Sequence, residues 1–153
     1  DGIVDIFLPD FKYISSEMAA RYSNAPDYPE VAKRALAQMV KQTGDAKFDE
    51  RDMMKRGVIV RHLILPGHIK ESKEAIRYLY ETYGDQIYIS IMNQYTPMPG
   101  IEKRFKNLGR TITQKEYDEV VDYAIDLGVE NGFIQEGETA KESFIPQFDD
   151  TGL

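Results

Sequence analysis

The chain of 153 residues contains no cysteine. Its own side chains therefore cannot form a disulfide, a thiolate zinc site or a cysteine-ligated iron–sulfur cluster. No apolar run approaches the roughly 20 residues that a membrane-spanning helix needs, and no signal peptide opens the sequence. An initiator methionine is also absent, and the sequence opens on Asp1 and Gly2 directly ahead of an apolar segment. We expect a fragment of a longer cytoplasmic protein that does not bind membranes.

The balance of charge excludes one class of partner. Acidic residues number 26 and basic residues 19, which gives a formal net charge of −7. Binding to nucleic acid needs a basic surface, so we expect no nucleic acid partner. Hydrophobic residues make up 42% and charged residues 29%, as in ordinary globular proteins. The length suits a single domain over residues 1–153.

The most apolar stretch, residues 57–67, predicts a β-strand that ends in a Pro-Gly turn. Such a near-continuous aliphatic run is typical of a strand buried on both faces of a parallel sheet. Arg61 and His62 interrupt it. Because a buried guanidinium is costly unless it is paired, Arg61 is a candidate functional residue. His62 should face the opposite side, toward a helix, as a packed structural histidine.

Strands and helices alternate along the rest of the chain. Further strands are predicted over residues 3–8, 87–92 and 133–135. Helices are predicted between these strands. The signals for them are a cap at Ser15 or Ser16, Pro29 in a first helical turn, an apolar stripe over residues 69–83 and the capping box Thr113 to Glu116. This alternation favours an α/β fold with parallel strands joined by helices.

Several conspicuous features have structural interpretations. The charged run over residues 47–56 is predicted to be an exposed connection, and His68 to help start the following helix. Tyr78, Tyr80, Tyr83 and Tyr88 are predicted to pack in the fold rather than form a stacking platform. The polar tail from Gly137, with Phe144, Ile145 and Phe148, is predicted to form an extended arm or a frayed end.

Polar side chains follow the predicted strands. Asp10 and Lys12 come after the first strand, and Asn93 to Tyr95 come after the third. In parallel α/β folds ligands sit at the carboxyl ends of the strands. We therefore expect these residues and Arg61 to form one rim. Lys12 and Arg61 suit a carboxylate there, and Asp10 suits an amine or a ribose hydroxyl, although Asp10 and Lys12 could equally form a solvated ion pair in a loop.

The order of three motifs carries a resemblance. They are Asp10-Phe11-Lys12 after a strand, Val60-Arg61-His62 ahead of Pro66-Gly67, and Ile91-Met92-Asn93-Gln94-Tyr95. In this order and spacing, residues 3–148 resemble the second half of the radical S-adenosylmethionine enzymes, in particular the pyruvate formate-lyase activating enzyme group. That family has an Asp-x-Lys after one barrel strand and an arginine on a strand that ends in a Val-Pro-Gly or similar turn. Residues 132–137 also look like the close of its domain.

The resemblance implies a partial TIM-like (βα) barrel, here the C-terminal portion with about four parallel strands and flanking helices. In the family a [4Fe–4S] cluster, held by a Cys-x3-Cys-x2-Cys loop, cleaves S-adenosylmethionine, and the 5′-deoxyadenosyl radical abstracts hydrogen from the substrate. Activating enzymes take a glycine of a partner enzyme, so a glycyl radical enzyme or another protein substrate is implied as partner. Without the cysteine loop, we expect this chain to be inactive alone.

The resemblance also assigns a site. Asp10 and Lys12 match positions that contact S-adenosylmethionine, and Arg61 matches one near its carboxylate. Tyr95 stands where activating enzymes often place a histidine that touches the cofactor, with Asn93 beside it. No catalytic residue and no metal ligand is assigned within this chain.

Two other functions stay open at this point. The chain could be a complete small α/β binding or interaction domain without catalysis, or a fragment of a cofactor-free lyase or aldolase with Lys12 as a Schiff-base amine. In the barrel interpretation the missing strands leave an exposed edge. Unpaired edges invite pairing, so we expect a homo-oligomer or a partner at that edge.

Overall fold

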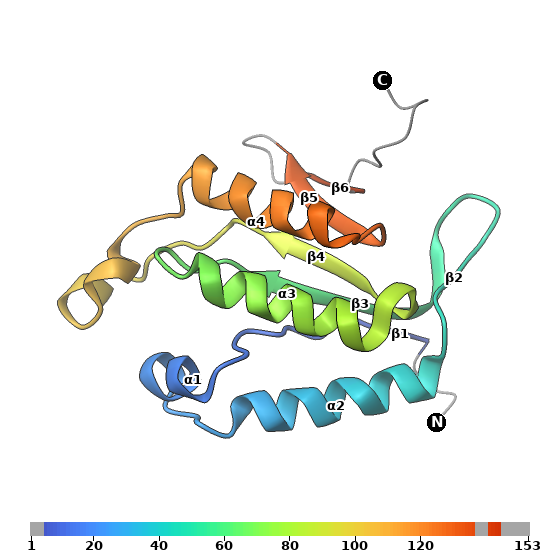
Figure 1. Ribbon diagram of the computed structural model, residues 1–153, viewed down its shortest axis with the longest axis horizontal. Helices are drawn as coiled ribbons and strands as arrows, with labels where there is room; N and C mark the ends of the chain where they lie inside the picture. The colour runs from blue at the N-terminus through green and yellow to red at the C-terminus, as the bar shows by residue number, and fades with distance from the viewer. Residues whose placement is uncertain (1–4, 137–140, 145–153) are drawn as a thin grey trace.

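The computed structural model describes residues 5–136 and 141–144, and strands alternate with helices through most of them (Figure 1). In chain order the elements are β1 (Ile6–Phe7), α1 (Ser16–Ser23), α2 (Tyr28–Thr43), β2 (Lys47–Phe48), β3 (Met54–Leu63), α3 (Ile69–Tyr83), η1 (Gly84–Gln86), β4 (Tyr88–Met92), η2 (Ile101–Lys103), η3 (Lys106–Gly109), α4 (Gln114–Leu127), β5 (Gly132–Glu136) and β6 (Lys141–Phe144). The predicted α/β class is confirmed.

Four strands of the sheet run parallel. The strand order is β1-β3-β4-β5-β6, in which β1, β3, β4 and β5 are parallel neighbours. β2 pairs with β3, and β6 with β5, in the antiparallel sense. The number of parallel strands agrees with the prediction. Because their order along the chain is also their order in space, each of the helices α2, α3 and α4 links two adjacent parallel strands.

Local signals place the helix ends where they were expected. The Ser15 side chain caps α1, Pro29 lies in the first turn of α2, and Thr113 and Glu116 form the complete capping box of α4. The predicted Pro-Gly turn is present as well. His68 N–H donates to the Leu65 carbonyl at 3.1 Å, and Gly67 has a φ of 77°, which favours glycine.

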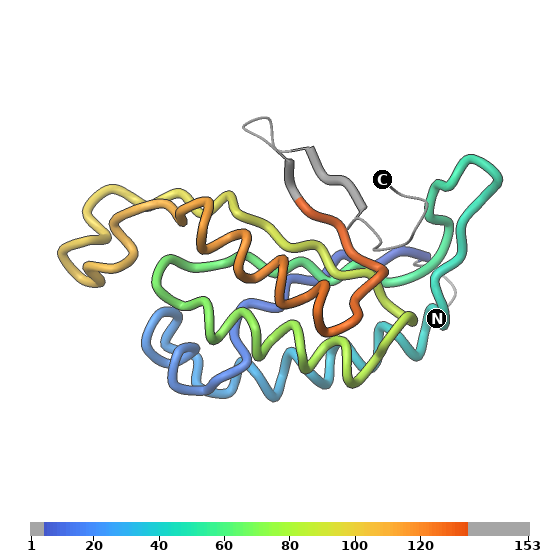
Figure 2. The backbone as a smooth tube through the Cα atoms, turned by 45° about the horizontal axis from the view of Figure 1, so that its top comes forward, coloured from blue at the N-terminus to red at the C-terminus, as the bar shows by residue number. Residues whose placement is uncertain are grey.

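Helices α2, α3 and α4 lie side by side on one face of the sheet, as Figure 1 and Figure 2 show. The Lys33 ammonium of α2 lies 4.7 Å from the centre of the Tyr78 ring of α3, and Lys73 of α3 pairs with Glu119 of α4. The core between the layers includes Val58, Val60, Ile89, Ile91, Leu36, Ala75, Ile76, Leu79, Val120 and Ala124. No helix within the described ranges is both long enough and apolar enough to cross a membrane.

The prediction that the central strand is buried on both faces is wrong. β3 begins at Met54 and ends at Leu63, and its residues alternate in burial. Val60 and His62 are buried beneath the helices, whereas Arg61 and Leu63 are only partly buried on the opposite face. Since α2, α3 and α4 all cover the same face, the aliphatic run on the other face stays partly open. Leu8, after β1, is 57% exposed.

Two other predictions need correction. Residues 47–56 do not form a mere connection, because β2 and the start of β3 pair there as a hairpin. Its turn closes on the Asp49 carboxylate, which accepts the N–H groups of Arg51 and Met53 at 2.8 and 3.0 Å. The first strand is shorter than predicted, and residues 3 and 4 lie outside the described residues, as do Gly137, Ile145 and Phe148 of the tail. The backbone of residues 141–144 forms β6.

His62 has the structural role that was predicted. It is 1% exposed, and its Nδ1 lies 2.8 Å from the Phe11 carbonyl oxygen while its Nε2 lies 2.8 Å from Ser72 Oγ. A carbonyl only accepts, so Nδ1 carries the proton and the Ser72 hydroxyl donates to Nε2. Burial lowers the pKa of His62, so the ring is neutral in the folded chain.

We expect His62→Leu to lower the free energy of unfolding by about 2 to 4 kcal/mol, because it leaves two buried polar groups without a partner. In the unfolded chain His62 binds a proton near its usual pKa of 6.5, whereas burial lowers its pKa in the folded chain. Stability is therefore complete above that pH and declines below it, by up to about 1.4 kcal/mol per pH unit for this group.

Urea unfolding between about pH 5 and 8 measures both effects. In the variant, the decline of the free energy of unfolding with falling pH should be smaller. The part of the decline that remains belongs to His68, whose pKa is also lowered by burial. A variant with the wild-type slope would contradict the assignment.

Candidate functional site

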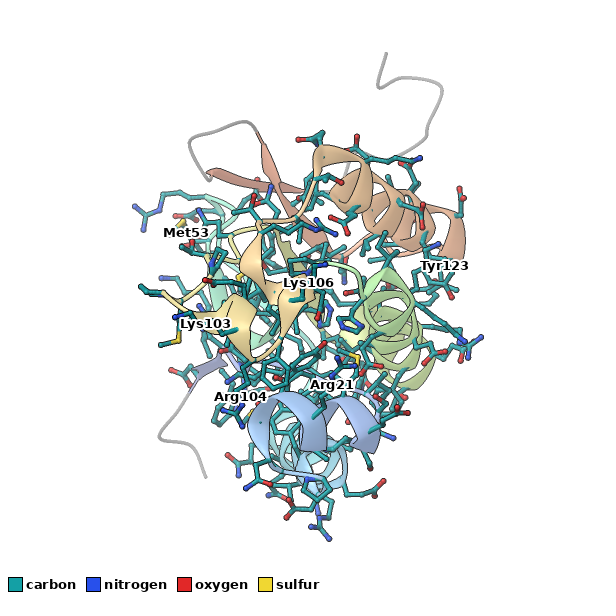
Figure 3. All side chains as sticks on the ribbon, turned by 90° about the vertical axis from the view of Figure 1, so that its left-hand side faces the viewer. Arg21, Met53, Lys103, Arg104, Lys106 and Tyr123 are labelled. Atoms are coloured by element: carbon teal, nitrogen blue, oxygen red, sulfur yellow. The ribbon has the colours of Figure 1, made fainter. Side chains whose placement is uncertain are left out.

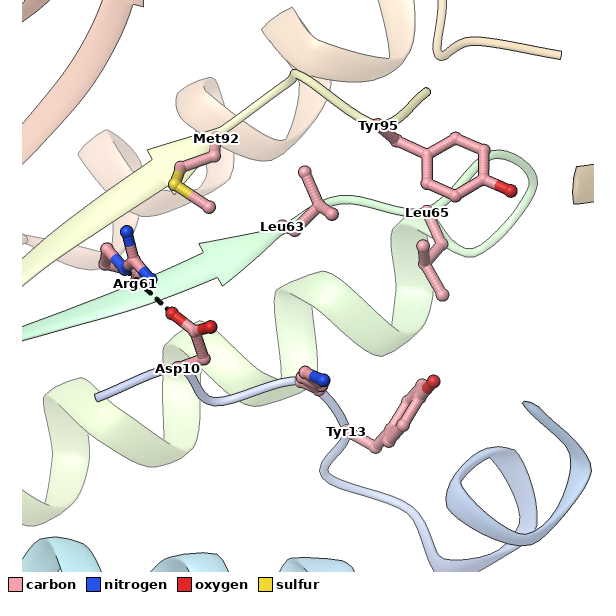
Figure 4. A pocket seen from close by; sticks show the side chains of 8 residues that line it. Asp10, Tyr13, Arg61, Leu63, Leu65, Met92 and Tyr95 are labelled. Carbon is pink, nitrogen blue, oxygen red and sulfur yellow. Dashed lines mark hydrogen bonds and ion pairs between the residues drawn. The ribbon is translucent and has the colours of Figure 1, made fainter. Parts of the chain in front are cut away.

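A cavity of about 220 Å³ opens at the carboxyl ends of β3 and β4 and of the segment after β1 (Figure 4). It lies on the face of the sheet that α2, α3 and α4 leave open, since Arg61 and Leu63 of β3 point into it. Its walls are formed by Asp10, Lys12, Tyr13, Arg61, Leu63, Leu65, Met92 and Tyr95. This is the end of a parallel sheet at which α/β proteins bind ligands.

The structure brings together four of the five residues predicted to contact a cofactor. Asp10, Lys12, Arg61 and Tyr95 all line the cavity, although they come from three separate segments of the chain. Asn93 follows β4 as predicted but is not among the lining residues. Met92 takes the inward position, and in extended backbone consecutive side chains point to opposite sides.

Arg61 and Asp10 form an ion pair across the cavity wall. Arg61 Nε donates to Asp10 Oδ1 at 2.8 Å, and both side chains are 43% exposed. Asp10 therefore pairs with Arg61 rather than with Lys12. Exposed ion pairs contribute little to stability, in the range of about 0 to 1 kcal/mol. The described residues provide no hydrogen-bond partner for the two terminal nitrogens of Arg61, so these remain available to an anion.

The segment that carries Asp10 and Lys12 is held by side chains of α2 and α3 that the sequence did not single out. The Glu71 carboxylate of α3 is almost fully buried and accepts the N–H groups of Ile14 and Ser15 at 2.7 and 2.9 Å. The Tyr28 hydroxyl accepts the Lys12 N–H at 2.9 Å and donates to the Asp10 carbonyl at 3.0 Å. Burial raises the pKa of Tyr28, which keeps it a donor.

The opposite wall of the cavity is joined to residues 101–110, which we call the arm. The Tyr95 hydroxyl donates to the Leu108 carbonyl at 2.8 Å. Asn107 Nδ2 lies 3.0 Å from the Tyr22 hydroxyl and 3.1 Å from His68 Nε2, and the Tyr22 hydroxyl lies 2.6 Å from the same nitrogen. His68 stands at the N-cap of α3 but makes no side-chain cap bond. The prediction that His68 helps start that helix is confirmed by its N-cap position, and its ring has the further role of holding the arm against α1.

Glu116 connects the arm to the turn after β3. Its carboxylate accepts from Arg110 Nη1 and Nη2 at 2.9 and 2.8 Å, from the Thr113 N–H at 2.7 Å and from the Gly67 N–H at 3.0 Å. Its side chain is 12% exposed. These donors, Arg110 first, lower the pKa of Glu116 to about 2.

The cavity has a charged end and an apolar end. Asp10, Lys12 and Arg61 supply one carboxylate and two cations, while Leu63, Leu65 and Met92 supply an aliphatic wall. The Tyr13 and Tyr95 rings stand beside that wall (Figure 4). This arrangement suits a ligand that joins a zwitterionic group to an apolar or flat body. Within the described residues no cluster of histidine, aspartate and glutamate could hold a metal ion.

The sequence is similar to that of an uncharacterized protein of Methanocaldococcus jannaschii, with 28% identity over 123 residues. The match covers 80% of this chain and 32% of the relative, so the chain spans about a third of the length of the protein it matches. No family model matches the sequence, and no solved structure gives a significant match. The comparisons relate the chain to a longer archaeal protein and assign it no activity.

We expect Glu116→Gln to lower the free energy of unfolding by about 2 kcal/mol at neutral pH, because four N–H groups of three residues lose a charged acceptor. Glu116 is ionised in the folded chain down to about pH 2 and in the unfolded chain down to about 4.5. Its contribution is therefore complete above pH 4.5 and is lost as the pH falls toward 2.

Chemical denaturation of the wild type and the variant at several pH values measures this difference, which should shrink in acid. Asp122→Asn, an exposed carboxylate on the same helix, should stay within about 0.5 kcal/mol of the wild type. An equal loss in both variants would refute the role of Glu116.

Proposed function

We propose that the chain is the C-terminal part of a partial (βα) barrel related to the radical S-adenosylmethionine enzymes, and that its cavity binds S-adenosylmethionine. The observation that carries this proposal is the meeting of Asp10, Lys12, Arg61 and Tyr95 at one cavity. A glycyl-radical-activating role for the whole protein, with a glycyl radical enzyme or another protein as substrate, is part of the same proposal.

The layout of the sheet supports a barrel wall. Four parallel strands follow one another in chain order, and the helices between them lie on a single face. Consecutive βα units of a barrel have this layout, with the helices outside and the other face of the strands turned to the interior. An open doubly wound sheet instead carries helices on both faces.

The donor set of the cavity fits the amino-acid part of the ligand. Arg61 and Lys12 can hold its carboxylate, and Asp10 can accept from its ammonium group. The aliphatic wall suits the rest of the molecule. The volume of about 220 Å³ is below the range of about 300 to 1,000 Å³ that is usual for ligand sites. We therefore expect part of the ligand to extend along the open face of the sheet.

The chain's residues do not fit the iron–sulfur cluster that the resemblance implies. It has no cysteine, and thiolates are the ligands of such clusters. The part that this chain's residues play is to bind and orient the ligand at the rim.

A second candidate function is the binding of a small molecule without catalysis. The cavity suits this function as well. The third, a Schiff-base lyase or aldolase, is weakened by Lys12, which is exposed. A Schiff-base lysine is usually activated in an apolar, desolvated pocket.

We expect the chain to bind S-adenosylmethionine in isothermal titration calorimetry, and Arg61→Ala to weaken that binding about tenfold or more because a carboxylate loses a charge-assisted partner. The fold should remain, since the Arg61 side chain is 43% exposed. Arg77→Ala removes an exposed arginine from α3 and should leave the affinity unchanged.

No binding by the wild type, or equal weakening by both variants, would remove S-adenosylmethionine from this site. Binding of a different amino acid derivative with the same dependence on Arg61 would favour the binding-domain function.

We also expect the chain to self-associate through the β1 edge. β1 ends the strand order, and Ile6 within it and Leu8 just after it are 37% and 57% exposed. In sedimentation velocity runs at rising concentration, Leu8→Lys should reduce association. Met53→Lys changes a similarly exposed apolar residue of the β2–β3 hairpin and should not. A wild-type chain that stays monomeric at high concentration would refute this expectation.

A further inference from the structure

We infer that an exposed basic patch at one end of the molecule docks an acidic segment of a partner protein. The patch consists of Arg21 on α1 and of Lys103, Arg104 and Lys106 on the arm (Figure 3). This inference rests on the distribution of charge and on the packing of the arginines, and it does not depend on the proposed binding of S-adenosylmethionine.

The charge of the arm is opposite to that of the chain. The whole chain has a net charge of −7, yet residues 101–110 contain four cations and one carboxylate. Arg110 is neutralised by Glu116, but all four residues of the patch are exposed and have no ion-pair partner among the described residues. Cations that gather without ion-pair partners repel one another, so an anionic partner would relieve the repulsion.

The two arginines are organised by aromatic rings. The guanidinium carbon of Arg104 lies 5.2 Å from the centre of the Phe105 ring, and that of Arg21 lies 6.0 Å from the same ring. Arg21 also lies 5.2 Å from the Tyr22 ring, which packs edge-on against Phe105 at 4.8 Å. Contact with a ring restrains a guanidinium and leaves its N–H groups available for carboxylates.

The support beneath these rings is itself fixed. Tyr22 is bonded to His68 and Asn107, so the arm and α1 present the patch as one unit. Because the two arginines lose fewer side-chain rotamers on binding, the patch binds more tightly than one whose arginines are unrestrained.

The shape and charge of the surroundings favour a protein partner. The arm projects from the end of the sheet, whereas small molecules bind in concave sites. A long polyanion such as nucleic acid would also meet the excess carboxylates of this acidic chain. A short acidic segment needs to cover only the patch. Tyr95, which lines the cavity, is bonded to Leu108 of the arm, so a docked segment would lie near the cavity.

Fluorescence anisotropy with a labelled oligoglutamate peptide tests this inference on the full chain. We expect binding that weakens as salt is raised, and the double variant Arg21→Gln with Arg104→Gln should lower the affinity about tenfold, or about 1.4 kcal/mol. The control pair Arg34→Gln with Arg77→Gln removes the same charge from exposed positions on α2 and α3 and should change the affinity less than about twofold.

A second pair, Lys103→Gln with Lys106→Gln, leaves both arginines in place and should also weaken binding. It tests the inference if the variant without the two arginines is poorly folded. An absence of binding, or equal losses in the patch and control pairs, overturns the inference. So does an oligothymidylate of the same charge that binds as tightly as the peptide, because the surface would then bind nucleic acid. Titrating S-adenosylmethionine into the patch variants keeps this test separate from the proposed function, since its affinity should not change.

Discussion

The hydrogen bond between buried His62 and the Phe11 carbonyl holds the site to the sheet. After β1 the chain pairs with β3 once more, where the Arg61 N–H donates to the Pro9 carbonyl and the Phe11 N–H donates to the Arg61 carbonyl, both at 2.8 Å. The polar backbone groups beyond this bridge need other partners. His62, Tyr28 and Glu71 supply them, from β3, α2 and α3. These side chains and the bridge to Arg61 together satisfy the backbone behind Asp10 and Lys12. The cavity thus depends on polar groups packed behind its wall.

The same logic governs the other wall of the cavity. Residues 101–110 contain only short 3₁₀ turns, so they depend on side chains for their position. Bonds to Tyr95, from Asn107 and to Glu116 hold them to the segment after β4, to α1 and to α4. The apolar core stabilises the layers, whereas directional bonds set the loops. One result is a basic, aromatic surface beside the cavity of an acidic chain.

Several parts of this arrangement were accessible from the sequence. The capping residues Ser15 and Thr113 marked helix starts because capping is a local interaction. Arg61 was conspicuous because a guanidinium in an aliphatic run needs a partner. In the structure that partner is Asp10, which lies 51 positions earlier in the chain. The sequence did not indicate Glu71, which looks like any polar residue of an amphipathic helix until the segment it supports is placed beside it.

Local pattern by itself determined the alternation of strands and helices, the caps, the turn at Pro66 and Gly67, and the inward orientation of His62, since each depends on neighbours a few residues away. Tertiary structure alone decided that one face of the sheet is left open by the helices and that Asn93 does not line the cavity. It also decided that Glu116 and His68 secure the arm. These outcomes depend on contacts between segments far apart in the chain, which burial and hydrogen bonding select only once the layers have packed.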